Sequence, residues 1–164
     1  MEEIARELEQ QRRFLSKDMH VLLVCVDDEP GLRDLLCDSG YQVSVESART
    51  AAHRVARAKQ QSWRAIPGSP SKSSASPDLV ILLAKQQQNT CLPHTPQPQD
   101  FSLLHSLALR LPPVVLAVEQ EAATQGLVLR ALTEGAADVL TLPLRRQEAC
   151  MLWQHVYKSQ LSMR

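Results

Sequence analysis

The sequence has no charge imbalance and no apolar run long enough to cross a membrane. Its 164 residues include 18 basic and 18 acidic side chains, which gives a formal net charge of zero at pH 7. A balanced chain has no overall attraction to nucleic acid, to an anionic membrane or to an acidic substrate. We therefore expect a soluble protein without direct nucleic-acid or membrane partners.

The sequence also lacks a C-x-x-C pair and a leader-like start. Three of its four cysteines stand in or beside apolar segments, where a thiol packs as a small hydrophobic group. The four are Cys25, Cys37, Cys91 and Cys150. The first twenty residues are charged rather than apolar, unlike a secretory signal. These features predict a reducing, intracellular location, in the nucleus or the cytoplasm.

Five short apolar runs alternate with segments whose apolar residues recur at helical spacing. Hydrophobic residues make up 44% of the chain, enough to form a core in a domain of this length. The runs, which we interpret as buried strands, are 20–26, 41–45, 78–84, 113–118 and 137–142. Five βα units with right-handed crossovers favour an α/β fold. We expect a flavodoxin-like, doubly wound parallel sheet of strand order 2-1-3-4-5.

Three segments fall outside this alternation. Residues 1–18 place Ile4, Leu8 and Leu15 on roughly one face and predict an N-terminal helical extension. Residues 60–77 and 85–100 are rich in Ser, Pro, Lys and Gln and show no periodicity, so we expect flexible insertions there. The folded domain is then predicted to span residues 19–160.

An acidic pair follows the first predicted strand. Asp27 and Asp28 stand between that strand and Pro30, which suits the first turn of a helix. One interpretation is helix capping, and the other is a divalent-metal site. In doubly wound sheets, functional groups gather beyond the carboxyl ends of the strands. Leu83, Val118 and Leu142 should reach the same edge, where only the aspartates are polar.

Several motifs resemble the receiver domain of two-component response regulators, the CheY-like superfamily. They are VDDEPGLR at 26–33, PDLVILL at 77–83, PPVVLAV at 112–118 and GAADVLTLPLR at 135–145. More narrowly, GYQV at 40–43 and the ending LW-x-H at 152–155 are similar to the pseudo-receivers of plant circadian-clock pseudo-response regulators. The resemblance covers roughly residues 19–157.

The resemblance implies a role for each matching position. An active receiver takes a phosphoryl group on an aspartate that ends strand three and holds Mg²⁺ with an acidic pair after strand one. It also uses a hydroxyl after strand four, a lysine before the strand-five proline and an aromatic switch residue. Here the acidic pair is Asp27 and Asp28, the acceptor position is Leu83, the hydroxyl position is Val118, the aromatic position is Val139 and the lysine position is Leu142.

These replacements predict a phosphorylation-independent pseudo-receiver without a catalytic residue, bound metal or cofactor. Leucine cannot carry an aspartyl phosphate, and two carboxylates alone serve Mg²⁺ poorly. We expect a protein-interaction module in signalling or transcriptional regulation, and the resemblance implies a possible clock role. One alternative is an enzyme or small-ligand binder, although the sequence shows no nucleophile–base pair and no glycine-rich phosphate loop. Another is a receiver that is phosphorylated elsewhere, for example on Asp78 or Asp138.

The final predicted helix supplies the expected interaction face. In receivers, partners bind through helix four, strand five and helix five. Trp153 should face the sheet, whereas Arg145, Arg146, His155 and Tyr157 combine charge with an aromatic ring, as interfaces do. We therefore expect self-association or partner binding through this face. A basic cluster on the second predicted helix, which includes Arg54 and Arg57, is the alternative face.

Overall fold

The structure, a computed structural model, describes residues 19–25, 30–61, 77–84, 98–109 and 112–162. The predicted N-terminal helix, the pair Asp27 and Asp28, and most of both predicted insertions lie outside these residues. The strands are β1 (His20–Cys25), β2 (Gln42–Ser47), β3 (Leu79–Ala84), β4 (Val114–Glu119) and β5 (Asp138–Leu142). The helices are α2 (Pro30–Asp38), α3 (Ala48–Gln61), α4 (Pro98–Ala108), η1 (Gln120–Ala122), α5 (Gln125–Thr133), α6 (Arg146–Ala149) and α7 (Trp153–Ser162).

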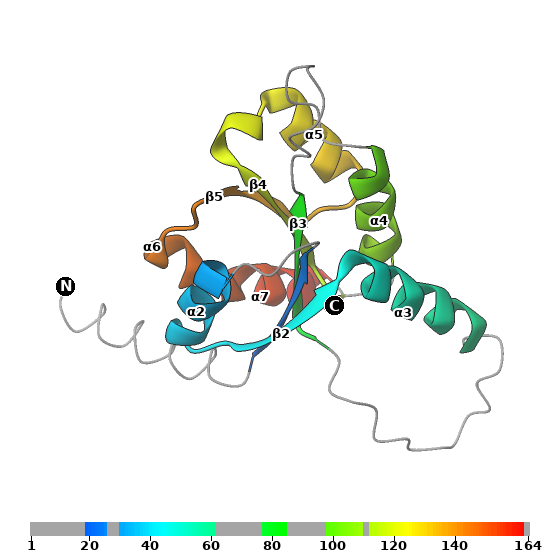
Figure 1. Cartoon of the computed structure of the whole chain (residues 1–164), viewed down its shortest axis with the longest axis horizontal. Coiled ribbons are helices and arrows are strands. Elements are labelled where there is room, and N and C mark those ends of the chain that lie inside the picture. The colour runs from blue at the N-terminus through cyan, green and yellow to red at the C-terminus, as the bar shows by residue number, and fades with distance from the viewer. Residues whose placement is uncertain (1–18, 26–29, 62–76, 85–97, 110–111, 163–164) are drawn as a thin grey trace.

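The five strands form one sheet of order β2-β1-β3-β4-β5, as Figure 1 shows. Every pairing in it is parallel. The predicted flavodoxin-like fold and strand order are therefore confirmed. Because all the strands point the same way, their carboxyl ends meet at one edge of the sheet and their amino ends at the other.

Two hydrophobic clusters fill the spaces on the two faces of the sheet. The first lies under α2, α6 and α7 and contains alternate strand residues such as Leu23, Ile81 and Ala117. The second lies under α3, α4 and α5 and contains their strand neighbours, such as Leu82 and Leu116. Strands β1, β3 and β4 are buried on both faces, which explains why they read as continuous apolar runs.

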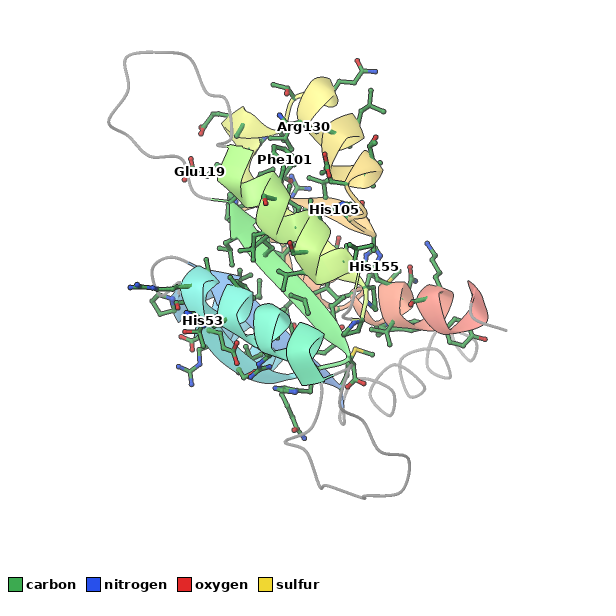
Figure 2. All side chains as sticks on the ribbon, turned by 90° about the vertical axis from the view of Figure 1, so that its right-hand side faces the viewer. His53, Phe101, His105, Glu119, Arg130 and His155 are labelled. Atoms are coloured by element: carbon green, nitrogen blue, oxygen red, sulfur yellow. The ribbon has the colours of Figure 1, made fainter. Side chains whose placement is uncertain are left out.

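Helix α4 is tied to α5 by contacts between side chains (Figure 2). The guanidinium of Arg130 lies over the ring of Phe101, with its central carbon 4.2 Å from the ring centroid. Nδ1 of His105 lies 3.3 Å from a carboxylate oxygen of Glu134 at the end of α5. A cation over a buried ring is stabilising, so these contacts fix the position of α5 relative to α4.

Element boundaries differ from prediction in three places. Helix α3 extends to Gln61 and α4 begins at Pro98, so both helices reach into the segments predicted as insertions. Helical spacing of Leu104, Leu107, Ala108 and Leu111 predicts one more turn, but helix α4 ends at Ala108 and Leu111 lies outside the described residues. Proline suits the first turn of a helix, which explains why α4 can begin at Pro98 within a proline-rich segment.

Helical spacing of Ala149, Leu152, Trp153 and Val156 predicts one final helix, which the structure divides into α6 and α7. Between them the chain makes i→i−3 hydrogen bonds, from the Met151 N–H to the Glu148 carbonyl and from the His155 N–H to the Leu152 carbonyl. Such bonds tighten a helix to about three residues per turn. Ala149, Leu152 and Val156 are all buried, so the tightened turn still directs the predicted apolar positions into the core.

A glycine after a predicted helix favours its termination, and in the structure Gly135 directly follows the C-cap of α5. Its φ of +105° is accompanied by hydrogen bonds from the Gly135 N–H to the Leu132 carbonyl and from the Ala136 N–H to the Ala131 carbonyl. This is the Schellman arrangement, which favours glycine because a side chain is strained at positive φ.

Replacing Gly135 with alanine should destabilise the domain by about 1–3 kcal/mol. The added Cβ would also lie only 2.9 Å from the Cβ of Ala108, so α4 would have to shift. Gly126→Ala is the matched control, because nothing lies within 4 Å of an added Cβ there. That variant should be as stable as the parent or up to about 1 kcal/mol more stable. Urea unfolding measures both, and equal stabilities would contradict the assignment of Gly135.

Candidate functional site

Three of the residues at the matching receiver positions, Leu83, Val118 and Leu142, stand at the carboxyl ends of strands, whereas Val139 lies near the start of β5. Leu83 pairs in register with Ala117, Ala84 with Val118, and Leu142 with Glu119. Leu83 and Leu142 contribute to the cluster under α2 and α7, whereas Val118 and Val139 contribute to the cluster on the opposite face. The structure thus brings Leu83 and Leu142 to one face of this edge and places Val118 on the other.

Leu83 is a core residue. It is 3% exposed and belongs to a cluster against which Leu35 of α2 and Leu142 of β5 also pack. Val118 is equally enclosed, at 1% exposed. The residues that the resemblance matches to the acceptor and hydroxyl positions of a receiver are therefore buried apolar side chains in this structure. Within the described residues, which exclude Asp27 and Asp28, no group of three or more His, Cys, Asp or Glu side chains could hold a metal.

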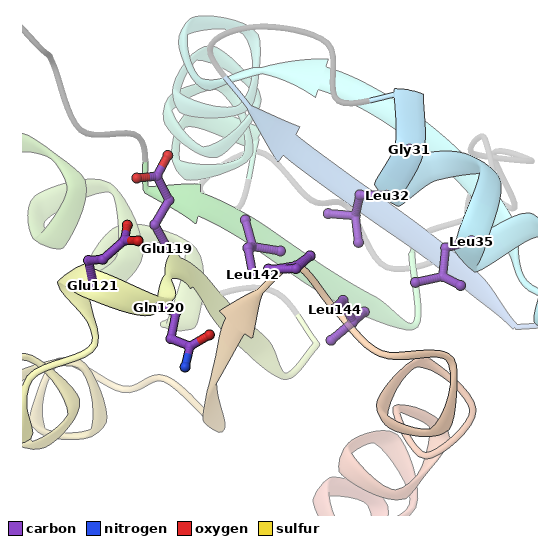
Figure 3. A pocket seen from close by; sticks show the side chains of 9 residues that line it. Gly31, Leu32, Leu35, Glu119, Gln120, Glu121, Leu142 and Leu144 are labelled. Carbon is purple, nitrogen blue, oxygen red and sulfur yellow. The ribbon is translucent and has the colours of Figure 1, made fainter.

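A pocket of about 600 Å³ opens at the same edge, beside these leucines (Figure 3). Three segments that are distant in sequence line it: the start of α2, the β4–η1 junction and the end of β5. The lining residues are Gly31, Leu32, Leu35, Glu119, Gln120, Glu121, Leu142, Pro143 and Leu144. The leucines of α2 and Leu144 form one side, and Glu119 and Glu121 stand on the other, with Leu142 between them.

Sequence reasoning missed the two glutamates. The signal was present, because Glu119 directly follows Val118 and so must reach the same edge of the sheet. We had considered only the strand-end positions that match an active receiver. The sequence EQEA, from 119 to 122, continues the strand into a short helical turn whose polar side chains are exposed.

The two aspartates considered as other phosphorylation sites lie at the amino edge, opposite to Leu83. Asp78 precedes β3, and its Oδ2 accepts a hydrogen bond from the His20 N–H at 2.9 Å. Asp138 begins β5, and its Oδ1 accepts one from the Val139 N–H at 2.8 Å. Both carboxylates therefore hold the starts of strands.

His155 is turned inward, contrary to the expectation that it lies at the rim. Its side chain is 15% exposed, and its Nε2 lies 3.4 Å from Oδ2 of Asp138. Burial lowers the pKa of His155; the carboxylate of Asp138 opposes that effect and the ammonium of Lys158 adds to it. The lowered pKa favours a neutral imidazole at pH 7. The contact between His155 and Asp138 joins α7 to β5.

The other three residues of the expected interaction face are exposed. Arg145 and Arg146 stand at the start of α6, where the Arg145 N–H donates to a carboxylate oxygen of Glu148 at 2.9 Å. Tyr157 is 53% exposed and its ring meets that of Trp153 edge to face, at 6.4 Å between centroids. On the alternative face, Arg54 is paired with Glu46, and the side chain of Arg57 lies outside the described residues.

Large apolar side chains are exposed on both sides of the edge strand β5. Leu129 and Leu132 of α5 are 59% and 44% exposed, and Met151, between α6 and α7, is 47% exposed. Helical spacing groups Leu132 with Leu127 and Ala131 on one predicted helix, but α5 buries only Leu127 and Ala131 and leaves Leu132 exposed. The segment LVLRAL carries more apolar residues than one helix face can bury, and that excess was the signal.

Five parallel strands in this order, with helices on both faces and a lined pocket at the carboxyl edge, define the receiver fold. Solved structures agree. A response regulator from Thermotoga maritima aligns with a TM-score of 0.60 at 13% identity, over 87% of this chain and 99% of that one. A response regulator receiver domain protein from Clostridium thermocellum gives 0.55 at 18% identity, over 89% and 99%. These likenesses show that the chain has the fold of a receiver domain.

Sequence comparison places the chain near plant proteins of this kind. It is 29% identical over 159 residues to the two-component response regulator-like protein APRR5 of Arabidopsis thaliana, covering 92% of this chain and 24% of that protein. It is 38% identical over 73 residues to the two-component response regulator ORR23 of Oryza sativa subsp. indica, covering 43% and 10%. The chain thus spans about a quarter of the length of APRR5. No protein-family model matches it.

Replacing Leu83 with aspartate should destabilise the domain by about 3 kcal/mol or more, because it removes a core side chain and buries a charge without a partner. Leu129→Asp is the matched control at a position that is 59% exposed, and it should change stability by less than about 1 kcal/mol. Urea unfolding at pH 7 measures both variants. A Leu83→Asp protein as stable as the control would show that position 83 does not lie in the core.

Proposed function

We propose that the chain is a phosphorylation-independent pseudo-receiver that acts as a protein-interaction module in signalling or transcriptional regulation. The observation that carries this proposal is the burial of Leu83, 3% exposed, at the position where a receiver holds its phosphoryl acceptor. A leucine has no oxygen nucleophile, so an aspartyl phosphate cannot form there. In this proposal the domain acts by binding and has no catalytic residue.

Leu142 supports the same conclusion from the neighbouring strand. At the position of the receiver lysine, it packs against the cluster that contains Leu83. An ammonium group there would face apolar side chains, which is costly unless a charge compensates it. Leu83 and Leu142 therefore belong to the same hydrophobic core, at positions where an active receiver has polar side chains.

Incubation of the chain with acetyl phosphate and Mg²⁺ should add no phosphate, as measured by intact mass spectrometry. Beryllofluoride with Mg²⁺ should likewise leave the amide resonances of Leu83 and Val118 unshifted. A stoichiometric, acid-labile phosphate would contradict the proposal. If such a phosphate formed, Asp78→Asn and Asp138→Asn variants would show which of the two alternative aspartates carries it.

The proposed interaction surface is the α5–β5–α7 face, defined by Leu129, Leu132, Arg146, Met151 and Tyr157. With no phosphate-driven shift in conformation, a partner must recognise a surface that the ground state already presents. Apolar and aromatic side chains beside arginine are the composition that interfaces favour. Four of the five large apolar side chains that are exposed among the described residues belong to this face.

Changing Arg146 to Glu and Tyr157 to Ala together should abolish association through this face, with little change in the melting temperature. Arg33→Glu with Leu109→Ala is the matched control, because it makes the same charge change and truncates a side chain that is 68% exposed elsewhere. Sedimentation velocity over a range of concentrations measures self-association. Association that survives the first pair of changes, or that is lost equally in the control, would rule out this face.

The proposal extends to cellular context. We place the protein inside the cell, in the nucleus or the cytoplasm, and suggest a role related to the circadian clock. The support is the LW-x-H ending at 152–155 and the 29% identity to a response regulator-like protein of Arabidopsis thaliana. No helix among the described residues is long and apolar enough to cross a membrane.

A further inference from the structure

The pocket at the carboxyl edge has an apolar side and an acidic side. Leu32, Leu35 and Leu144 form the apolar side, and they are buried or half-buried. Glu119 and Glu121 stand across from them and are exposed to solvent. A volume of about 600 Å³ lies within the range of roughly 300–1,000 Å³ that ligand pockets span.

The two carboxylates are available to a ligand. Within the described part of the chain, neither Glu119 nor Glu121 forms an ion pair or a side-chain hydrogen bond. Arg33 and Arg145 follow lining leucines in the sequence, but neither lines the pocket. An entering cation would therefore meet two carboxylates and no cationic side chain among the lining residues.

A group that suits both sides must combine an apolar body with a positive charge. Lysine and arginine have this form, because their methylene stems lie along apolar surface while the charged head stays near water. The pocket is too large for one such side chain, so an adjacent apolar residue could occupy the rest of the leucine side. A free anion would match neither side, and a purely polar ligand would leave the leucine side uncovered.

We propose that this pocket binds a partner polypeptide segment in which a lysine or arginine stands beside apolar side chains. The leucines receive the apolar groups and the stem, and Glu119 and Glu121 receive the cation. This site lies at the carboxyl edge, beside η1 and the start of α2, and it is separate from the α5–β5–α7 face. The proposal stands whether or not that face binds a partner.

Two capped peptides test the charge preference: acetyl-Leu-Lys-Leu-amide and acetyl-Leu-norleucine-Leu-amide. Titrated into the full 164-residue chain labelled with ¹⁵N, both should shift the amides of Gly31, Leu35 and Leu144. The lysine peptide should bind about fivefold more tightly, the size expected for exposed ion pairs. That preference should shrink in about 0.5 M salt, because salt screens charges, while binding of the norleucine peptide should not weaken.

Paired variants locate the charge and the pocket. Glu119→Gln with Glu121→Gln should remove the lysine preference, whereas Asp38→Asn with Glu134→Gln, the same charge change at the amino edge, should keep it. Gly31→Phe should weaken both peptides, because an added side chain at Gly31 has open space at the pocket. Gly126→Phe, also in open space but outside the lining residues, should not.

Several results would overturn the proposal. They are equal binding of the two peptides, no binding of either, a lysine preference that survives in Glu119→Gln with Glu121→Gln, or shifts confined to α5, β5 and α7. None of these results bears on whether Arg146 and Tyr157 mediate association, which sedimentation velocity measures separately.

Discussion

Burial of the central strands on both faces is the constraint on which the rest of the structure depends. Alternate residues of β1, β3 and β4 enter two separate hydrophobic clusters, so each strand needs helices on both sides of the sheet. That requirement places α2, α6 and α7 on one face and α3, α4 and α5 on the other. It also leaves no polar position along β3, whose six residues are all buried.

The same constraint explains the chemistry of the carboxyl edge. In a doubly wound sheet this edge is where the core ends and polar groups can act. Here the core continues through Leu83 to Leu142, so the apolar environment reaches the strand ends themselves. Polar groups are displaced outward to Glu119 and Glu121, one residue and three residues beyond Val118. A pocket is present at this edge, and its lining combines leucine side chains with the carboxylates of Glu119 and Glu121.

Most of the fold could be predicted from sequence, because the five apolar runs are long, regular and separated by helical periodicity. The strand-end positions of Leu83, Val118 and Leu142 followed from the same runs. The pocket could not be predicted, since three distant segments form it and no local pattern joins Leu32 to Glu121. The sequence also does not show which face of α5 is buried. The helix has many apolar residues, and its rotation against its neighbours determines which of them enter the core.

The inward position of His155 was missed for a related reason. Helical spacing places His155 at the margin of the buried face that contains Trp153 and Val156. Whether such a side chain points inward depends on which residue it can contact there. Asp138, at the start of strand β5, is that residue. A contact between residues 17 positions apart in sequence depends on the packing of α7 against β5, which sequence periodicity does not describe.

The ties between α4 and α5 have a consequence for control. Arg130 over Phe101, His105 beside Glu134, and the close approach of Gly135 to Ala108 hold the C-terminal end of α5 against α4. A surface held in one arrangement offers a partner the same affinity at all times. For the proposed interaction through the α5–β5–α7 face, occupancy of the complex would then follow the concentrations of the two proteins, and its timing would come from their synthesis and breakdown.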